Sequence, residues 1–151
     1  MPAAIWNSLF RVAVGGFWLY FARQKWTGVA WVEPLLVRTP QVNPIPGMRQ
    51  LLSALVVPHW LAFAVLQTAG ETLVALLLIA GLMTRPAALL GALLATGLSL
   101  TIAFLDTDAG SRWLYYLAVL VNLQVLAAGP GPLALDARLP LPRWLGARDG
   151  R

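Results

Sequence analysis

Long apolar windows, separated by short polar or proline-containing stretches, make up most of this chain. No charged residue lies between Pro86 and Leu105, and none lies between Trp113 and Leu135. A helix that spans a bilayer needs roughly 20 predominantly apolar residues, and each window is about that long. The pattern therefore predicts four transmembrane helices, over residues 4–26, 60–83, 85–105 and 111–128.

The connections between the later helices are short and carry residues that start and stop helices. Thr84 can cap the helix that follows it, and Pro86 is tolerated in a first turn, where its missing N–H has no intrahelical partner. Ser111 can cap the last helix, and Gly129–Pro132 ends it. Since short turns place consecutive helices antiparallel, we expect an all-α integral membrane protein, an antiparallel four-transmembrane-helix bundle.

The first connection, residues 27–59, is much longer than the others. Four prolines predict an irregular first half: Pro34, Pro40, Pro44 and Pro46. Residues 47–58 form one apolar helical face that is too short to span a bilayer, so we expect an interfacial or re-entrant helix there. The apolar residues of this face are Leu51, Leu52, Leu55 and Val56. The tail, residues 133–151, mixes apolar and basic residues and is expected to lie on the membrane or on a partner. The whole chain is interpreted as one membrane domain.

The composition supports this class. Hydrophobic residues make up 59% of the chain and charged residues only 11%, whereas about a quarter of a soluble domain is charged. The sequence has no cysteine, which excludes disulfides and thiolate metal sites in this chain, and it has no haem or other metal motif. With a net charge of +5, lipid headgroups are a better counter-charge than nucleic acid, because the basic residues lie mostly beside the apolar windows.

The orientation in the membrane depends on charges that nearly balance. Four spans put both termini on one side, where five basic residues lie: Arg85, Arg138, Arg143, Arg148 and Arg151. Five lie on the other side: Arg23, Lys25, Arg38, Arg49 and Arg112. The tight turn at Arg85 and the acidic loop at residues 106–108 favour cytoplasmic termini. We expect an integral protein of a bacterial inner membrane, with the lipid bilayer and other membrane subunits as partners.

Several polar residues interrupt the apolar windows. Arg11 and Lys25 share one helical stripe, and Gln67 lies one turn before Glu71. A stripe on the last helix carries Tyr115 and Asn122. An unpaired charge at mid-helix costs about 2.5–3.5 kcal/mol on insertion scales, so such charges usually face the bundle interior and pair.

The sequence predicts that Arg11 pairs with Glu71, with Gln67 or Asn122 adding a hydrogen bond. Such a pair can simply fix the register of two helices. Alternatively, the cluster binds a polar head such as a quinone carbonyl, or relays a proton. His59 is better interpreted as an interfacial histidine than as a metal ligand. The chain contains no nucleophile–base constellation or phosphate loop, so no catalytic residue can be named and enzymatic activity of the chain alone is left open.

Three segments resemble, in order, the motifs of the DoxX family of small membrane proteins. "RVAVGGFWLYFARQKW" (residues 11–26) is similar to the opening helix of the family, with Arg, Gly four residues later and Lys near the end. "ETLVALLLIAGLMTRPAALLGALL" (residues 71–94) has the Glu, the Gly ten residues later and the Thr-Arg that follows. "GPGPLALD" (residues 129–136) is similar to the closing segment.

The resemblance implies a four-helix fold and association with redox enzymes, since the family includes the DoxD-type subunit of thiosulfate:quinone oxidoreductase. It points to seven positions: Arg11, Gly15, Lys25, Glu71, Gly81, Arg85 and Asp136. The sequence departs from the pattern in three places. Val74-Ala75 replaces a pair of glycines, Ala134 replaces the closing Ser, and the third connection lacks a histidine.

The leading functional prediction is therefore a DoxX-like membrane subunit of a quinone-linked oxidoreductase, with quinone as the cofactor. The predicted contacts to the quinone or to lipid heads are Arg11, Lys25, Gln67, Glu71, Arg85 and Asn122. The alternative is a non-catalytic subunit that anchors, scaffolds or assembles a larger membrane complex. A small-solute transporter or channel is a third hypothesis.

Overall fold

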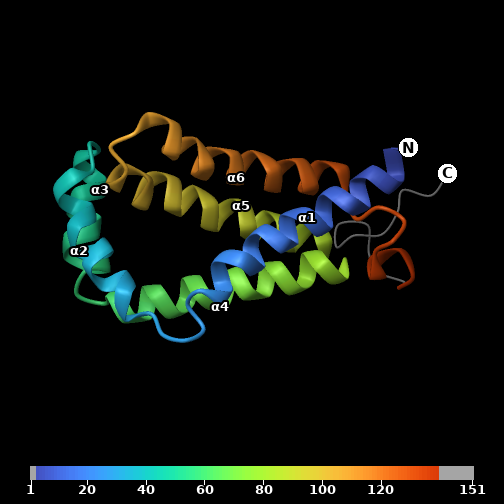
Figure 1. Ribbon diagram of the computed structural model, residues 1–151, viewed down its shortest axis with the longest axis horizontal. Coiled ribbons are helices and arrows are strands. Elements are labelled where there is room, and N and C mark those ends of the chain that lie inside the picture. Colours follow the sequence, from blue (N-terminus) through green and yellow to red (C-terminus); the bar gives the residue numbers. More distant parts are fainter. Residues whose placement is uncertain (1–2, 140–151) are drawn as a thin grey trace.

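The computed structural model describes residues 3–139, and this part of the chain is all-helical. Four long helices form the body: α1 (Ala3–Arg23), α4 (Trp60–Ala80), α5 (Thr84–Leu100) and α6 (Ala109–Ala128) (Figure 1). Within the described residues, α4 and the stretch Thr84–Leu105 are long and apolar enough to cross a membrane. The predicted all-α fold is thus confirmed.

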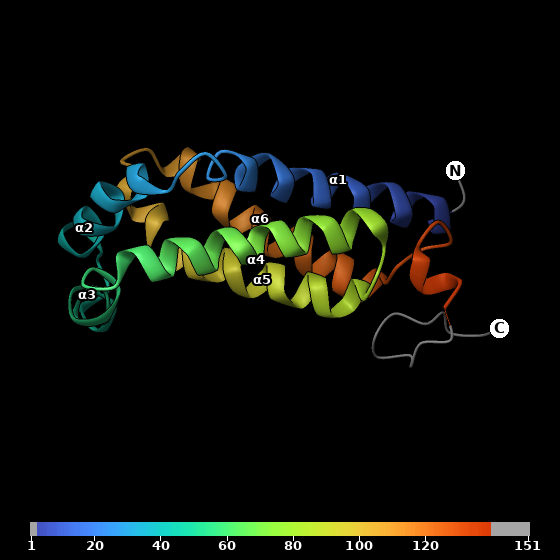
Figure 2. The ribbon, with the colours of Figure 1, turned by 90° about the horizontal axis from the view of Figure 1, so that it is seen from below.

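The long helices associate as two pairs. Helix α1 packs mainly against α4, and α5 packs mainly against α6. The pairs approach each other at the end where α1 begins and α6 ends, and they diverge toward the opposite end (Figure 1), while the view from below shows the helices running lengthwise side by side (Figure 2). The buried core lies between them and includes Trp18, Val74 and Leu78.

Small residues set the closest approaches between helices. The buried face of α5 is built from small side chains: Ala87, Ala88, Gly91, Ala92 and Ala95. On α1, a Cβ added to Gly15 would lie 3.0 Å from the backbone nitrogen of Ile79 and 3.2 Å from the carbonyl oxygen of Ala75. Small residues at such positions let helix backbones approach closely, so Gly15 fixes how α1 sits on α4.

We therefore expect Gly15→Ala to destabilise the protein by about 1–3 kcal/mol, the usual cost of overpacking, because the backbone of α4 has to move away. Gly16→Ala is the matched control, since a Cβ there meets nothing within 4 Å. The control should be neutral or stabilising by up to about 1 kcal/mol, because alanine favours helix over glycine. Thermal unfolding of both variants in detergent micelles checks the contrast. Equal effects at the two positions would show that the α1–α4 contact is not close.

The long first connection is more helical than the prolines predicted. It contains a short 3₁₀ turn (Ala30–Val32), then α2 (Glu33–Val42) and α3 (Pro46–Leu51), and α3 continues into a π-helical turn (Leu52–Val56). The prediction of an irregular first half was wrong, because Pro34 occupies the first turn of α2, where no N–H is needed. We refer to residues 30–56 as the cover.

The cover lies across the end at which the two helix pairs diverge (Figure 1). Its Asn43 is buried and donates a hydrogen bond from Nδ2 to the carbonyl oxygen of Leu100, at 2.8 Å. That carbonyl belongs to the last residue of α5, after which Thr101 leaves helical geometry and a 3₁₀ turn (Ile102–Leu105) follows. The expected helix over 85–105 is therefore broken at Thr101, and the cover is attached there.

Candidate functional site

A cavity of about 430 Å³ lies at the open end of the bundle, between the two helix pairs and beneath the cover. Most of its wall is apolar or aromatic, with contributions from Phe17 on α1, Trp31 and Leu36 in the cover, and Phe63 on α4. Its volume falls within the 300–1,000 Å³ range of small-molecule sites, which are also mostly apolar with a few convergent polar groups. The polar groups here are concentrated at one place.

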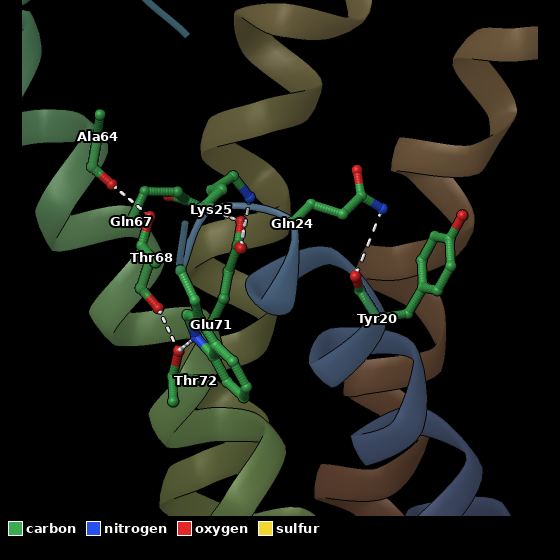
Figure 3. A network of polar contacts seen from close by, with 9 residues as sticks. Tyr20, Gln24, Lys25, Ala64, Gln67, Thr68, Glu71 and Thr72 are labelled. Carbon is green, nitrogen blue, oxygen red and sulfur yellow. Dashed lines mark hydrogen bonds and ion pairs between the residues drawn. The ribbon is translucent and has the colours of Figure 1, made fainter. Parts of the chain in front are cut away.

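That place is formed by Lys25, Gln67 and Glu71, which we call the Glu71 cluster (Figure 3). Lys25 Nζ lies 2.5 Å from Glu71 Oε2, and Gln67 Nε2 donates to Glu71 Oε1 at 3.0 Å. Gln67 and Glu71 are four residues apart on α4 and so share one face, whereas Lys25 follows directly after α1. The cluster therefore joins α1 to α4 at the wall of the cavity.

The carboxylate is the most enclosed member of the cluster. Only 1% of the Glu71 side chain is exposed, against 13% for Lys25. Each oxygen of the carboxylate already accepts one hydrogen bond. An ammonium carries three N–H donors and an amide two, so Lys25 and Gln67 keep donors that Glu71 does not use. The cluster can thus offer hydrogen bonds to an acceptor oxygen without adding net charge to the cavity.

The predicted pairing of Arg11 with Glu71 is wrong. Gly15 packs against Ala75 and Ile79, and this register places Arg11 near Ile79, eight residues from Glu71 along α4. Eight residues correspond to about 12 Å of helix, which separates the two charges. Lys25, not Arg11, lies beside Glu71.

Arg11 instead holds the opposite end of the bundle together. Its guanidinium donates hydrogen bonds to the carbonyl oxygens of Pro130, at 3.0 Å, and Ile79, at 3.1 Å, and also to that of Leu78. The side chain is 1% exposed. Two of the three acceptors lie at the C-terminal end of α4, where helix carbonyls lack intrahelical partners. Arg11 therefore belongs to no polar cluster around Glu71.

Asp136 completes this end. It is buried, and its carboxylate accepts hydrogen bonds from the backbone nitrogens of Met83, at 2.7 Å, and Thr84, at 2.8 Å. Its own backbone nitrogen donates to the carbonyl oxygen of Gly81, at 2.9 Å. Asp136 thus caps α5 with a charge that favours a helix N-terminus. We call Arg11, Asp136 and the segment 129–136 the clasp.

The remaining predicted residues also lie away from the cavity. Arg85 lies at the same end as the clasp, within reach of Gly129. Asn122 is fully buried, accepts a hydrogen bond from Trp18 Nε1 at 3.2 Å and donates to the carbonyl oxygen of Ala118 at 2.7 Å. Trp18 itself lines the cavity, so Asn122 supports the wall without reaching the space inside.

The weaker sequence signals have local explanations. His59 Nδ1 lies 3.0 Å from the carbonyl oxygen of Leu55. Asp108 caps α6 by accepting a hydrogen bond from the backbone nitrogen of Ser111, and this bond lowers the pKa of the carboxyl. In the described part of the chain, no three potential ligands from His, Cys, Asp and Glu gather as a metal site. The tail prediction for residues 133–151 falls largely outside the described residues.

Some cavity residues were missed in the sequence. Trp31 and Leu36 lie in the cover, which the prolines had marked as irregular, so no periodic signal singled them out. Tyr115 also lines the cavity. Its place on the same stripe as Asn122 was a usable signal that it faces the interior.

A family model described as "TQO small subunit DoxD" matches residues 6–141. This match covers most of the chain and confirms the resemblance noted from the three motifs. No curated protein and no solved structure matches the chain significantly.

Proposed function

This chain belongs to the DoxD family, and we propose that it is a membrane-spanning subunit of a quinone-linked oxidoreductase. In this proposal the four long helices span the bilayer, and the quinone head binds in the cavity against Lys25, Gln67 and Glu71. The observation that carries the proposal is the apolar cavity with one hydrogen-bonding cluster in its wall.

The outer surface supports membrane insertion. Large apolar side chains are exposed along the outer faces of the long helices, as on α4 (Leu61, Val65, Leu66, Leu73, Leu76) and on α6 (Leu117, Leu120, Leu123). Contiguous apolar surface of this extent is rare on soluble monomers. A helix of 20 residues is about 30 Å long, which matches the hydrocarbon core of a bilayer.

The chemistry of the cavity supports a quinone head. A quinone ring is flat and apolar, and its polar atoms are carbonyl oxygens that only accept hydrogen bonds. The apolar wall suits the ring, and the unused donors of Lys25 and Gln67 suit an oxygen. A bound quinone supplies two-electron redox chemistry, while the protein supplies binding, orientation and the local charges.

Glu71 has a second role in this proposal. Its carboxylate holds Lys25 and Gln67 in place, since it accepts a hydrogen bond from each. Lys25 is partly exposed whereas Glu71 is buried, so the pair also offers a short route for a proton from the surface to the cavity wall. Electrons come from a partner subunit in this scheme.

The contacts also favour one alternative, a non-catalytic scaffold. The Lys25–Glu71 pair joins α1 to α4, and a buried ion pair can serve to fix helix register. In that case the cluster needs no ligand, and the chain contributes shape and anchoring to a larger membrane complex.

Native purification in mild detergent tests the proposal. We expect quinone to be extracted from the wild-type protein in an amount comparable to the protein. Gln67→Leu should retain at least several-fold less, because it removes a donor while leaving the ion pair intact. Glu33→Gln is the matched control, since this exposed carboxyl at the start of α2 does not line the cavity.

Mass spectrometry of the same preparations identifies subunits that come with the chain. Equal quinone in the wild type and Gln67→Leu would contradict the proposed head position. A wild-type preparation that holds partner subunits but no quinone would contradict quinone binding and support the scaffold.

A further inference from the structure

One polar side chain of the cavity wall does not belong to the Glu71 cluster. Tyr115 lies on the first half of α6 and lines the same cavity. Lys25, Gln67 and Glu71 come from α1 and α4, the other helix pair. The two pairs diverge at this end (Figure 1), and Tyr115 and the Glu71 cluster line the cavity from different pairs.

The Tyr115 hydroxyl is not engaged elsewhere. The side chain is half-buried, and within residues 3–139 its hydroxyl makes no hydrogen bond to the protein. The other residues that α6 contributes to the wall, Leu114 and Ala118, have apolar side chains, and a tyrosine hydroxyl that becomes buried beneath a ligand usually finds a partner. Thr101, which follows α5 and also lines the cavity, already donates to the carbonyl oxygen of Gly97, at 2.6 Å.

We propose that Tyr115 is a second binding residue of this cavity and donates a hydrogen bond to a second acceptor oxygen of the ligand. The ligand class is then a flat apolar ring with acceptor oxygens at opposite ends, as in a para-quinone. This inference rests on the proposed function, in which the first oxygen lies at Lys25 and Gln67.

With a hydrogen-bond donor at Tyr115 as well as in the Glu71 cluster, the site should favour ligands that carry two acceptor oxygens. A ligand with only one carbonyl can satisfy the Glu71 cluster but leaves the Tyr115 hydroxyl without a partner. A polar group that a ligand buries without a partner is costly, and sites built to hydrogen-bond a ligand group discriminate strongly against analogues that lack it. The wild-type protein should therefore prefer a dicarbonyl over the matching monocarbonyl.

The test compares 1,4-naphthoquinone with 1-tetralone, a bicyclic ketone with one carbonyl. Binding is measured on the full-length protein in detergent by quenching of tryptophan fluorescence, since Trp18 and Trp31 line the cavity. Tyr115→Phe should weaken the binding of 1,4-naphthoquinone about three- to tenfold, the range for one hydrogen bond, and leave that of 1-tetralone unchanged. Tyr116→Phe is the control, because Tyr116 packs against Trp113 and does not line the cavity.

The outcomes separate the two proposals. If Tyr115→Phe binds 1,4-naphthoquinone as tightly as the wild type, the role of Tyr115 is overturned while the proposed function stands. If Tyr115→Phe weakens the binding of both compounds by the same factor, Tyr115 has only a structural role and the inference is overturned. If the Gln67→Leu variant binds both compounds as tightly as the wild type does, the proposed function fails and this inference fails with it.

Discussion

Lys25→Met is expected to lower the free energy of unfolding by about 3 kcal/mol, the lower end of what breaking a buried ion pair costs. The reason is that Glu71, which is 1% exposed, loses the cation that neutralises it. The cost stays at the lower end because the Lys25 side chain is 13% exposed, so the pair is not fully removed from solvent. Thermal or denaturant unfolding in detergent measures the change.

The double variant Lys25→Met with Glu71→Leu distinguishes register from function. Replacing both members of a buried pair with apolar residues is often neutral or stabilising, so most of the lost stability should return. Extraction should nevertheless recover several-fold less quinone, because the Lys25 donor has gone and Gln67 is no longer held in place by Glu71. If the double variant is as unstable as the sum of the single variants, the two residues are not coupled. If it folds and still retains quinone, the pair only sets register.

Arg11→Met is expected to be at least as damaging, with a loss of about 3–5 kcal/mol. It leaves the carbonyl oxygens of Ile79 and Pro130 without their donor, and it removes a cation that interacts electrostatically with the buried Asp136. Arg23→Met, at the end of the same helix, is the control. Arg23 is exposed, and its Cζ lies 5.1 Å from the centroid of the Tyr20 ring. Its replacement should therefore lower the free energy of unfolding by less than about 1 kcal/mol.

A double-mutant cycle with Asp136→Asn isolates the electrostatic part of the clasp. If Arg11 and Asp136 stabilise each other, the double variant should lose less stability than the two single losses added together. Strict additivity would mean that Arg11 acts through the carbonyl oxygens alone. A melting temperature of Arg11→Met close to that of the wild type would contradict the clasp.

The helices were predictable because their signal is local. The predicted bounds of α1, α4 and α6 lie within three residues of the observed ones, whereas the helix expected over 85–105 ends at Leu100. Helix α2 was missed because Pro34 and Pro40 were interpreted as breakers, although a proline in a first turn is compatible with a helix. Position within the helix, which composition does not report, decides what each proline does.

The residues of the Glu71 cluster could be named from the sequence, but the ion pair within it could not be predicted. Lys25, Gln67 and Glu71 were all named, yet Glu71 was assigned to Arg11. A helical stripe shows which residues share a face, but it does not show how far one helix slides along its neighbour. That register depends on the close approach at Gly15, a contact between the backbones of α1 and α4. The cavity likewise depends on the cover, whose residues lie far from Tyr115 in sequence.

The clasp and the cavity occupy opposite ends of the same two helix pairs. With the pairs fastened at one end, a rotation of a few degrees about the clasp becomes a displacement of ångströms at the other, some 30 Å away along helices of this length. At that distant end the cover connects the two helix pairs through the hydrogen bond from Asn43 to the carbonyl oxygen of Leu100. A partner that binds the outside of the cover can therefore change the width of the cavity without entering it.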